Sequence, residues 1–245
     1  MNVIVKFISK ARRIEQINMP IFDKYFDEYE VEHIDNENDT FTTIIYSNEK
    51  PKQIQFGDRD KTNESLLEIV ELNADALLSC KHMFANCVNL RDINMKNMNT
   101  RYVKDMEGMF FNCAAKILDL SKFDTGKVTT RRDMFHSCEA RIIDCRSFDT
   151  SKVIDMHDMF YSCREARHIK VDSFNTSNVE NMQAMFYGCH SLVELDLRSF
   201  DTSKVNDVKY MFANCYDLEK LLLADNFIRE DMDQTEMFAL CDKLQ

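Results

Sequence analysis

The sequence predicts an α/β fold in which copies of one short motif stack as a right-handed solenoid, each copy supplying a short strand and a helix. Three observations predict it. A motif recurs every 25 or 26 residues, each copy contains a short alternating apolar run, and apolar residues at helical spacing follow that run. The repeats are predicted to occupy residues 65–245, after a small α+β cap over residues 1–64.

The repeat is anchored by a Met-Phe pair with a Cys three residues after the Phe. Successive anchors are 26, 25, 25, 26, 26 and 26 residues apart, which excludes chance recurrence. A single copy buries too little apolar surface to offset the entropy of ordering it, so the copies must stack. The pairs begin at Met83, Met109, Met134, Met159, Met185, Met211 and Met237.

The strand of each copy follows the Cys. Residues 192–197 and 218–223 alternate apolar and polar side chains, which is typical of a short strand. In two copies one residue is missing before the strand, so Leu118 with Leu120, and Ile143 with Cys145, are expected in the inward positions.

The helix of each copy is predicted from the next segment. Its apolar residues recur at i, i+3, i+6, i+7 and i+10, the spacing of one helical face. Ser177 with Glu180 three residues later matches a capping box at the start of such a helix. In the clearest copy the apolar residues are Val205, Val208, Met211, Phe212 and Cys215.

The first repeat is degenerate. Alignment from Met83-Phe84 predicts a strand and turn over residues 66–76, although Leu, Glu and Ala there also favour a continuous helix. The inward positions are expected to be Leu67, Ile69, Leu72, Leu77 and Cys80.

The segment Leu192 to Cys215, LVELDLRSFDTSKVNDVKYMFANC, resembles the unit of the BspA-like leucine-rich repeats, a family also described as a domain of unknown function in mycoplasmal surface proteins. The resemblance extends over roughly residues 66–245. It implies a leucine-rich-repeat solenoid and says little about function, because such folds serve many binding roles.

Residues 1–64 lack the repeat and are acidic. Up to Cys80 there are 16 Asp and Glu against 9 Lys and Arg. Hairpin-like pieces are predicted at 41–46 and 54–56, around a turn at 48–51. The segment is interpreted as a cap on the first repeat, and the alternative is an independent domain that gives specificity.

A cytoplasmic location is expected, in a cell or in a virus-infected cell. No stretch approaches the ~20 apolar residues of a membrane span. The start of the chain has no basic segment before its apolar run, which Lys6 interrupts, so it does not resemble a signal peptide.

No catalytic, cofactor-binding or metal-binding site is expected. The nine Cys occupy apolar positions of the repeat and are interpreted as structural thiols. The histidines, at 33, 82, 136, 157, 168 and 190, form no ligand pair with metal-site spacing. An enzyme would have to lie within residues 1–64.

The outward strand positions form two neighbouring columns in which an acid in one column stands beside a base in the other, with the order inverted at Lys170 and Asp172. One interpretation is mutual compensation along each strand. The other is a striped face that binds a protein partner, with Leu222 as an apolar anchor. Its predicted residues are Asp144, Arg146, His168, Lys170, Glu194, Asp196, Arg198, Lys220 and Leu222.

The sequence therefore predicts a non-catalytic protein-binding module. The alternative is a structural assembly component, such as a virion or surface-lattice subunit, that self-associates through its last repeat. The net charge of −11 argues against a nucleic-acid partner, which requires a basic surface.

Overall fold

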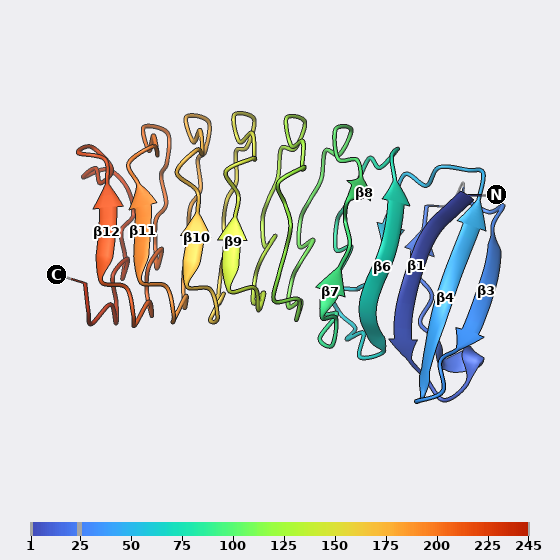
Figure 1. The fold of residues 1–245 in the computed structure, drawn as a ribbon. Helices are drawn as coiled ribbons and strands as arrows, with labels where there is room; N and C mark the ends of the chain where they lie inside the picture. Colours follow the sequence, from blue (N-terminus) through green and yellow to red (C-terminus); the bar gives the residue numbers. More distant parts are fainter. Residues whose placement is uncertain (1, 24–25, 245) are drawn as a thin grey trace.

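The computed structural model describes residues 2–23 and 26–244. An N-terminal β-sheet leads into a row of stacked repeats, and the two chain termini lie at opposite ends of the molecule (Figure 1). Each repeat forms one layer of the stack, and we call one such layer a rung.

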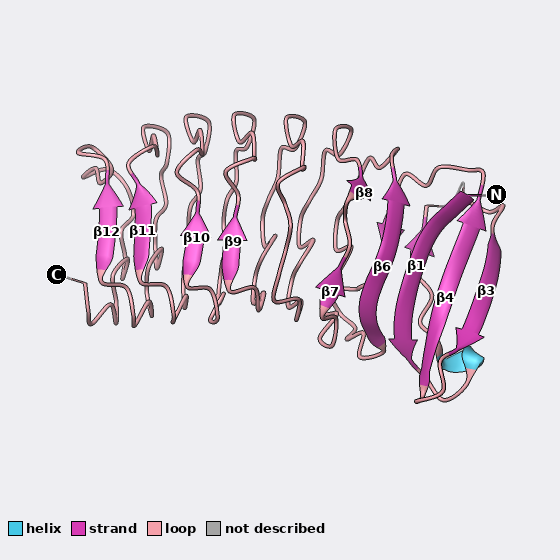
Figure 2. Cartoon of the chain, viewed as in Figure 1, coloured by secondary structure: helices cyan, strands magenta, loops and turns pink. Residues whose placement is uncertain are grey.

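The N-terminal sheet has the strand order β3-β4-β1-β6-β7, and β8 also pairs with β6. Strands β1 (Asn2–Lys10), β3 (Glu30–Asp35) and β4 (Thr40–Ser47) are long and antiparallel. Inward side chains of β1 and β4, among them Val5, Phe7 and Ile45, are fully buried. The sheet is the broad, continuous layer beside the stack in Figure 2.

Strand β6 (Leu66–Ala74) connects the sheet to the stack. It pairs antiparallel with β1 and parallel with β7 (Asp92–Ile93) and β8 (Asn97–Met98). The short strands β2 (Ile21–Phe22) and β5 (Ile54–Gln55) pair with each other, and η1 (Ile14–Gln16) is a single 3₁₀ turn. The N-terminal residues thus cover the edge of β6 that faces away from the rungs.

Parallel pairing continues along the stack. Strand β9 (Ile142–Asp144) pairs with β10 (His168–Lys170), and β11 (Glu194–Leu197) pairs with β12 (Lys220–Leu223). A second wall is built from parallel bridges between consecutive rungs, at Ser79, Asp105, Thr130, Asp155, Asn181, Asp207 and Asp233.

A column of stacked phenylalanines runs through the core. Ring centroids of neighbouring rungs lie 5.3 to 5.8 Å apart, from Phe84 to Phe238, and Phe56 of the N-terminal region begins the column 5.7 Å from Phe84. The Phe56 amide also donates to the Met83 carbonyl oxygen, as each later Phe does to the Met of the next rung. Phe56 therefore takes the place that the Phe of a Met-Phe pair takes in a rung, although it lies in the N-terminal region. The division into residues 1–64 and 65–245 stays a prediction.

Buried threonines explain the Asp-Thr of the motif. Thr150 Oγ1 donates to the Asn175 carbonyl oxygen at 2.8 Å and accepts from the Asn175 amide at 2.7 Å. Thr125 and Thr176 make the same paired contacts with the following rung. Each hydroxyl satisfies a donor and an acceptor that burial would otherwise leave unpaired.

The predicted α/β solenoid with one helix per repeat is wrong. The described residues contain strands, turns and one 3₁₀ turn, and they contain no α-helix, as Figure 2 shows. The cap is likewise a β structure rather than α+β. The five residues assigned to the helix face, Val205, Val208, Met211, Phe212 and Cys215, are fully buried, but a chain of turns places them there.

The direction of the amide hydrogen bonds explains the difference. The Met211 amide donates to the Val208 carbonyl oxygen, an i to i+3 turn, whereas the Phe212 amide donates to Met237 on the next rung. Tyr210 and Asn214 adopt left-handed backbone conformations, with φ of 56° and 61°, which interrupt any helix. Turns of three and four residues give nearly the same apolar spacing as an α-helix, so local periodicity could not separate them.

Other local predictions had mixed outcomes. The strand predicted at residues 66–76 is confirmed as β6, with Leu67 only half-buried. The capping box is wrong, because the Ser177 amide donates to Asn175 Oδ1 in a turn. Segments 41–46 and 54–56 are strands, but β4 pairs with β1 and β3 while β5 pairs with β2, so they form no hairpin.

Candidate binding face

The outward side chains of the strand wall form one continuous surface, which we call the strand face. It extends over β6, β7, the segment 117–121 and β9 to β12, which follow one another along one side of the stack (Figure 1). The parallel register sets Asp144 beside Lys170, and Glu194 beside Lys220. The predicted columns are therefore present in these strands.

In two rungs, charged residues of the strand face pair with each other. Arg146 grips Asp144 through two hydrogen bonds, Nε to Oδ1 at 2.9 Å and Nη2 to Oδ2 at 2.6 Å. Arg198 holds Asp196 in the same way, at 3.0 and 2.7 Å. The repeated geometry follows from the two-residue spacing, which puts both side chains on the same side of a strand.

Contacts between rungs add to these pairs. Lys170 Nζ lies 3.6 Å from Asp144 Oδ2, and Lys220 donates to Glu194. The hydrogen bonds from Arg146 lower the pKa of Asp144 to about 2, and those from Arg198 lower the pKa of Asp196. The compensation interpretation thus fits these residues, because their charges pair with one another within the chain.

Two further predicted residues, His168 and Leu222, lie on the same surface outside these charge pairs. His168 is exposed on β10. Leu222, expected as an exposed anchor, is half-buried on β12. All nine predicted residues share the strand face, but whether they bind a partner stays a prediction.

The apolar feature of the face lies elsewhere, and the sequence interpretation missed it. Ile117 is 74% exposed, and Ile142, at the corresponding outward position of the next rung, is 51% exposed. Beside Ile117 is a groove of about 330 Å³, also lined by Val70, Ile93 and Phe123. Each isoleucine directly precedes an inward residue, Leu118 or Ile143, and this outward placement of an apolar residue was the available signal.

The groove coincides with an interruption of the strand wall. Residues 117–121 have no strand pairing among the described residues, although β7 precedes them and β9 follows on the next rung. A second groove, of about 500 Å³, lies on the other side of this segment and is bordered by Asp119, Asp144 and Arg146. Residues 117–121 thus contribute to two grooves of the strand face.

The cysteines do not contribute to the surface. Eight of the nine thiols are buried and Cys241 is half-buried, and all are free. Burial raises the pKa of the Cys87 and Cys138 thiols to about 12, so these sulfurs stay protonated and unreactive near neutral pH.

No helix of the described residues is long and apolar enough to cross a membrane.

Comparison with known proteins identifies a family. The family model described as "Mycoplasma protein of unknown function, DUF285" matches residues 55–169 and again 141–245. The match begins beside Phe56, the first ring of the phenylalanine column. No curated protein and no solved structure matches the chain.

Proposed function

The chain belongs to the DUF285 family of Mycoplasma-type proteins of unknown function, and we propose that it is a non-catalytic module that binds a protein partner through the strand face. One observation carries the proposal: Ile117, 74% exposed, lines a groove of the strand face, and Ile142, 51% exposed, occupies the corresponding position of the next rung. Exposed apolar side chains beside a groove, rimmed by polar residues, are typical of interaction sites.

The partner presents an apolar side chain flanked by basic residues. Around the groove the acids Glu68, Asp92 and Asp119 outnumber the bases Lys96 and Lys122, and the whole chain carries a net charge of −11. The acidic charge steers a basic partner toward the face, while burial of the apolar side chain holds it there. Parallel pairing of β6 with β7 and of β9 with β10 holds the rungs on either side of residues 117–121, so little entropy is lost on docking.

A comparison of three variants tests the proposal. Ile117→Asp with Ile142→Asp removes the apolar feature, and Arg146→Glu with Arg198→Glu disrupts the charge pairs. Ile154→Asp is the matched control, because Ile154 is 51% exposed but lies outside the strand face. Each is used as bait in affinity capture from the native source, with captured proteins quantified against the wild type.

We expect a partner captured by the wild type and by Ile154→Asp to be lost with Ile117→Asp/Ile142→Asp. Loss with the arginine pair as well would extend the site to the predicted residues of β9 to β12. Equal capture by all baits would contradict binding through the strand face.

A second candidate is a structural assembly role through the last rung. Phe238, which stacks on Phe212, remains 37% exposed, and Leu240 is 57% exposed. Under this candidate the chain forms a stable oligomer that Phe238→Asp or Leu222→Asp dissociates, measured by sedimentation at several concentrations. A concentration-independent monomer would contradict it.

The finer family assignment and the location belong to the same proposal. The motif of residues 192–215 supports a relationship to the BspA-like leucine-rich repeats, although the lack of α-helix in the described residues distinguishes this structure from a helix-containing repeat. Nine free thiols support work in a reducing compartment such as the cytoplasm, of a cell or a virus-infected cell.

A further inference from the structure

Three potential metal ligands meet on the side of the stack where the Met-Phe turns lie. Asp133, His136 and Asp158 each offer one ligand atom, and these atoms lie within 4.8 Å of one another. His136 Nδ1 and Asp133 Oδ1 are 3.4 Å apart. Ligands of a tetrahedral zinc ion with bonds near 2.0 to 2.1 Å are separated by about 3.3 Å, so this pair already has the required spacing.

The repeat itself brings the carboxylates together. Asp133 and Asp158 immediately precede the Met-Phe pairs of consecutive rungs, and both adopt the left-handed conformation, with φ of 57° and 55°. Equivalent backbone on adjacent rungs directs the two side chains the same way. Because Asp133 and Asp158 are 25 residues apart in sequence, the spacing of residues along the chain does not reveal that they are neighbours.

Stacking fixes the imidazole. The His136 ring lies between Phe111, at 4.7 Å, and Tyr161, at 4.5 Å, in a column of rings. The His136 amide also donates to the Asp133 carbonyl oxygen at 3.1 Å. The ring therefore has little freedom to turn Nδ1 away from Asp133, and a pre-oriented ligand loses less entropy on binding a metal ion.

Burial gives a second, independent indication. The Asp133 side chain is 2% exposed, and His136 Nδ1, which faces its Oδ1, has no hydrogen-bond partner of good geometry among the described residues. A buried carboxylate is costly unless its charge is compensated. The side chains of His136 and Asp158 are 21% and 19% exposed, which leaves an entry from solvent.

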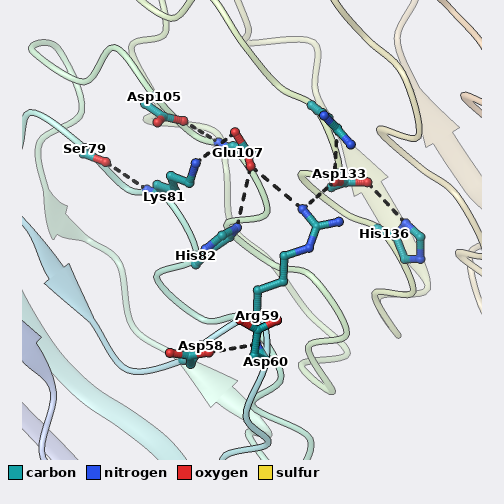
Figure 3. A network of polar contacts seen from close by, with 12 residues as sticks. Asp58, Arg59, Asp60, Ser79, Lys81, His82, Asp105, Glu107, Asp133 and His136 are labelled. Carbon is teal, nitrogen blue, oxygen red and sulfur yellow. Dashed lines mark hydrogen bonds and ion pairs between the residues drawn. The ribbon is translucent and has the colours of Figure 1, made fainter.

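In the absence of a cation, two arginines compensate the charge of Asp133 at its oxygen Oδ2. Arg59 Nη1 lies 2.9 Å and Arg132 Nε 3.5 Å from Asp133 Oδ2, while Oδ1 faces His136 (Figure 3). Arg59 also approaches Glu107 at 3.8 Å and lies over the Phe111 ring. It can thus keep other partners when a cation binds Asp133.

A neighbouring histidine supports the third ligand. His157 Nε2 lies 3.1 Å from Asp158 Oδ2, which orients this carboxylate and leaves its other oxygen for a metal. We propose that Asp133, His136 and Asp158 form a binding site for a divalent transition cation, with Zn²⁺ as the preferred ion and water completing its coordination. One imidazole and two carboxylates suit Zn²⁺, whereas Ca²⁺ and Mg²⁺ prefer oxygen ligands alone.

The test measures binding of Zn²⁺ to the folded full chain by equilibrium dialysis, in a Cys241→Ser background that removes the half-exposed thiol. Co²⁺ absorption reports the ligand type, and thermal unfolding with and without Zn²⁺ reports linkage to folding. The variants are His136→Gln, Asp158→Asn and Arg59→Met. The control is His190→Gln, because His190 stacks on Tyr216 outside the cluster.

We expect one Zn²⁺ per chain, bound at least about tenfold more weakly by His136→Gln and by Asp158→Asn and unchanged by His190→Gln. Arg59→Met is expected to bind several-fold more tightly, because a positive charge 2.9 Å from Asp133 is removed. Equal Zn²⁺ binding by the wild type and both ligand variants, no binding at all, or thiolate absorption bands with Co²⁺ would overturn the site.

Discussion

Arg131 donates a hydrogen bond of 2.8 Å from Nη2 to the main-chain oxygen of Asp149, yet its side chain is fully buried in the apolar core. Nε and Nη1 of the same guanidinium have no hydrogen-bond partner among the described residues. On the neighbouring rungs the same position is occupied by Met106 and Met156, both fully buried. Burial lowers the pKa of Arg131 to about 10, the direction expected where the charged form is destabilised.

Arg131→Met is therefore expected to stabilise the protein. It removes two unpaired donors and a buried charge and restores the methionine of the adjacent rungs, which is expected to add about 1 to 3 kcal/mol to the free energy of unfolding. The measurement is urea unfolding with an unchanged m value. Arg167→Met, at an exposed position, is the control. A lower stability of Arg131→Met would mean that the cation over the Phe148 ring, 5.2 Å away, is net favourable.

The junction between the N-terminal region and the first rung depends on Gly57. A Cβ added there would lie 1.9 Å from the Ala85 carbonyl oxygen, a backbone atom that cannot move aside alone. Gly57→Ala is expected to cost about 1 to 3 kcal/mol, mainly by loosening residues 54–63 from the stack. At Gly126 the nearest atom to an added Cβ is a side-chain oxygen of Asp149, at 3.3 Å, so Gly126→Ala is the matched control.

Hydrogen exchange with urea unfolding distinguishes the outcomes. In Gly57→Ala the Phe56 amide, which donates to Met83, should exchange faster than in the wild type, while amides near Phe186 keep their protection. Uniform loss of protection along the stack would show that the region is not a separable cap. Unchanged exchange would contradict the contact.

The sequence predicted burial better than backbone conformation. The inward positions from Val205 to Cys215 followed from the period alone, because every rung repeats the same environment. The helix failed, because the amide of Phe212 has its acceptor one rung away, and no single repeat contains that information. One local signal was available: the residue directly before the anchor Cys adopts left-handed backbone, and in six copies it is Asn, Ser or Gly, namely Asn86, Asn112, Ser137, Ser162, Gly188 and Asn214.

The binding features were harder to predict for a related reason. Charges two residues apart, such as Asp196 and Arg198, could be paired from sequence. Asp133 and Asp158 become neighbours only through the exact register of two rungs, and the contact from Arg59 comes from the N-terminal region. Both require the three-dimensional arrangement.

The thiols should fall into two classes by their reactivity toward a thiol reagent. Cys241 is half-buried and the other eight cysteines are buried, and desolvation raises their pKa values, so the reactive thiolate is scarce. We expect an aromatic disulfide reagent to modify one thiol per folded chain, slowly, and nine after denaturation. Cys241→Ser should abolish the folded-state reaction. Rapid modification of several thiols in the folded protein would contradict the burial of these cysteines.

Acid should weaken the strand face through Asp144. Its folded pKa, about 2, lies below the ordinary value because Arg146 hydrogen-bonds the carboxylate, so its contribution to stability is fully present above about pH 4. The contribution is lost as the pH falls through about 2. The pair is partly exposed, with 37% of the Asp144 side chain accessible, so the contribution is below about 1 kcal/mol.

Asp144→Asn should therefore be slightly less stable than the wild type at pH 6 and equal to it near pH 2, measured by urea unfolding at low salt. Asp225→Asn, at an exposed position after β12, is the control. A difference between Asp144→Asn and the wild type that grows on acidification would contradict the pairing with Arg146.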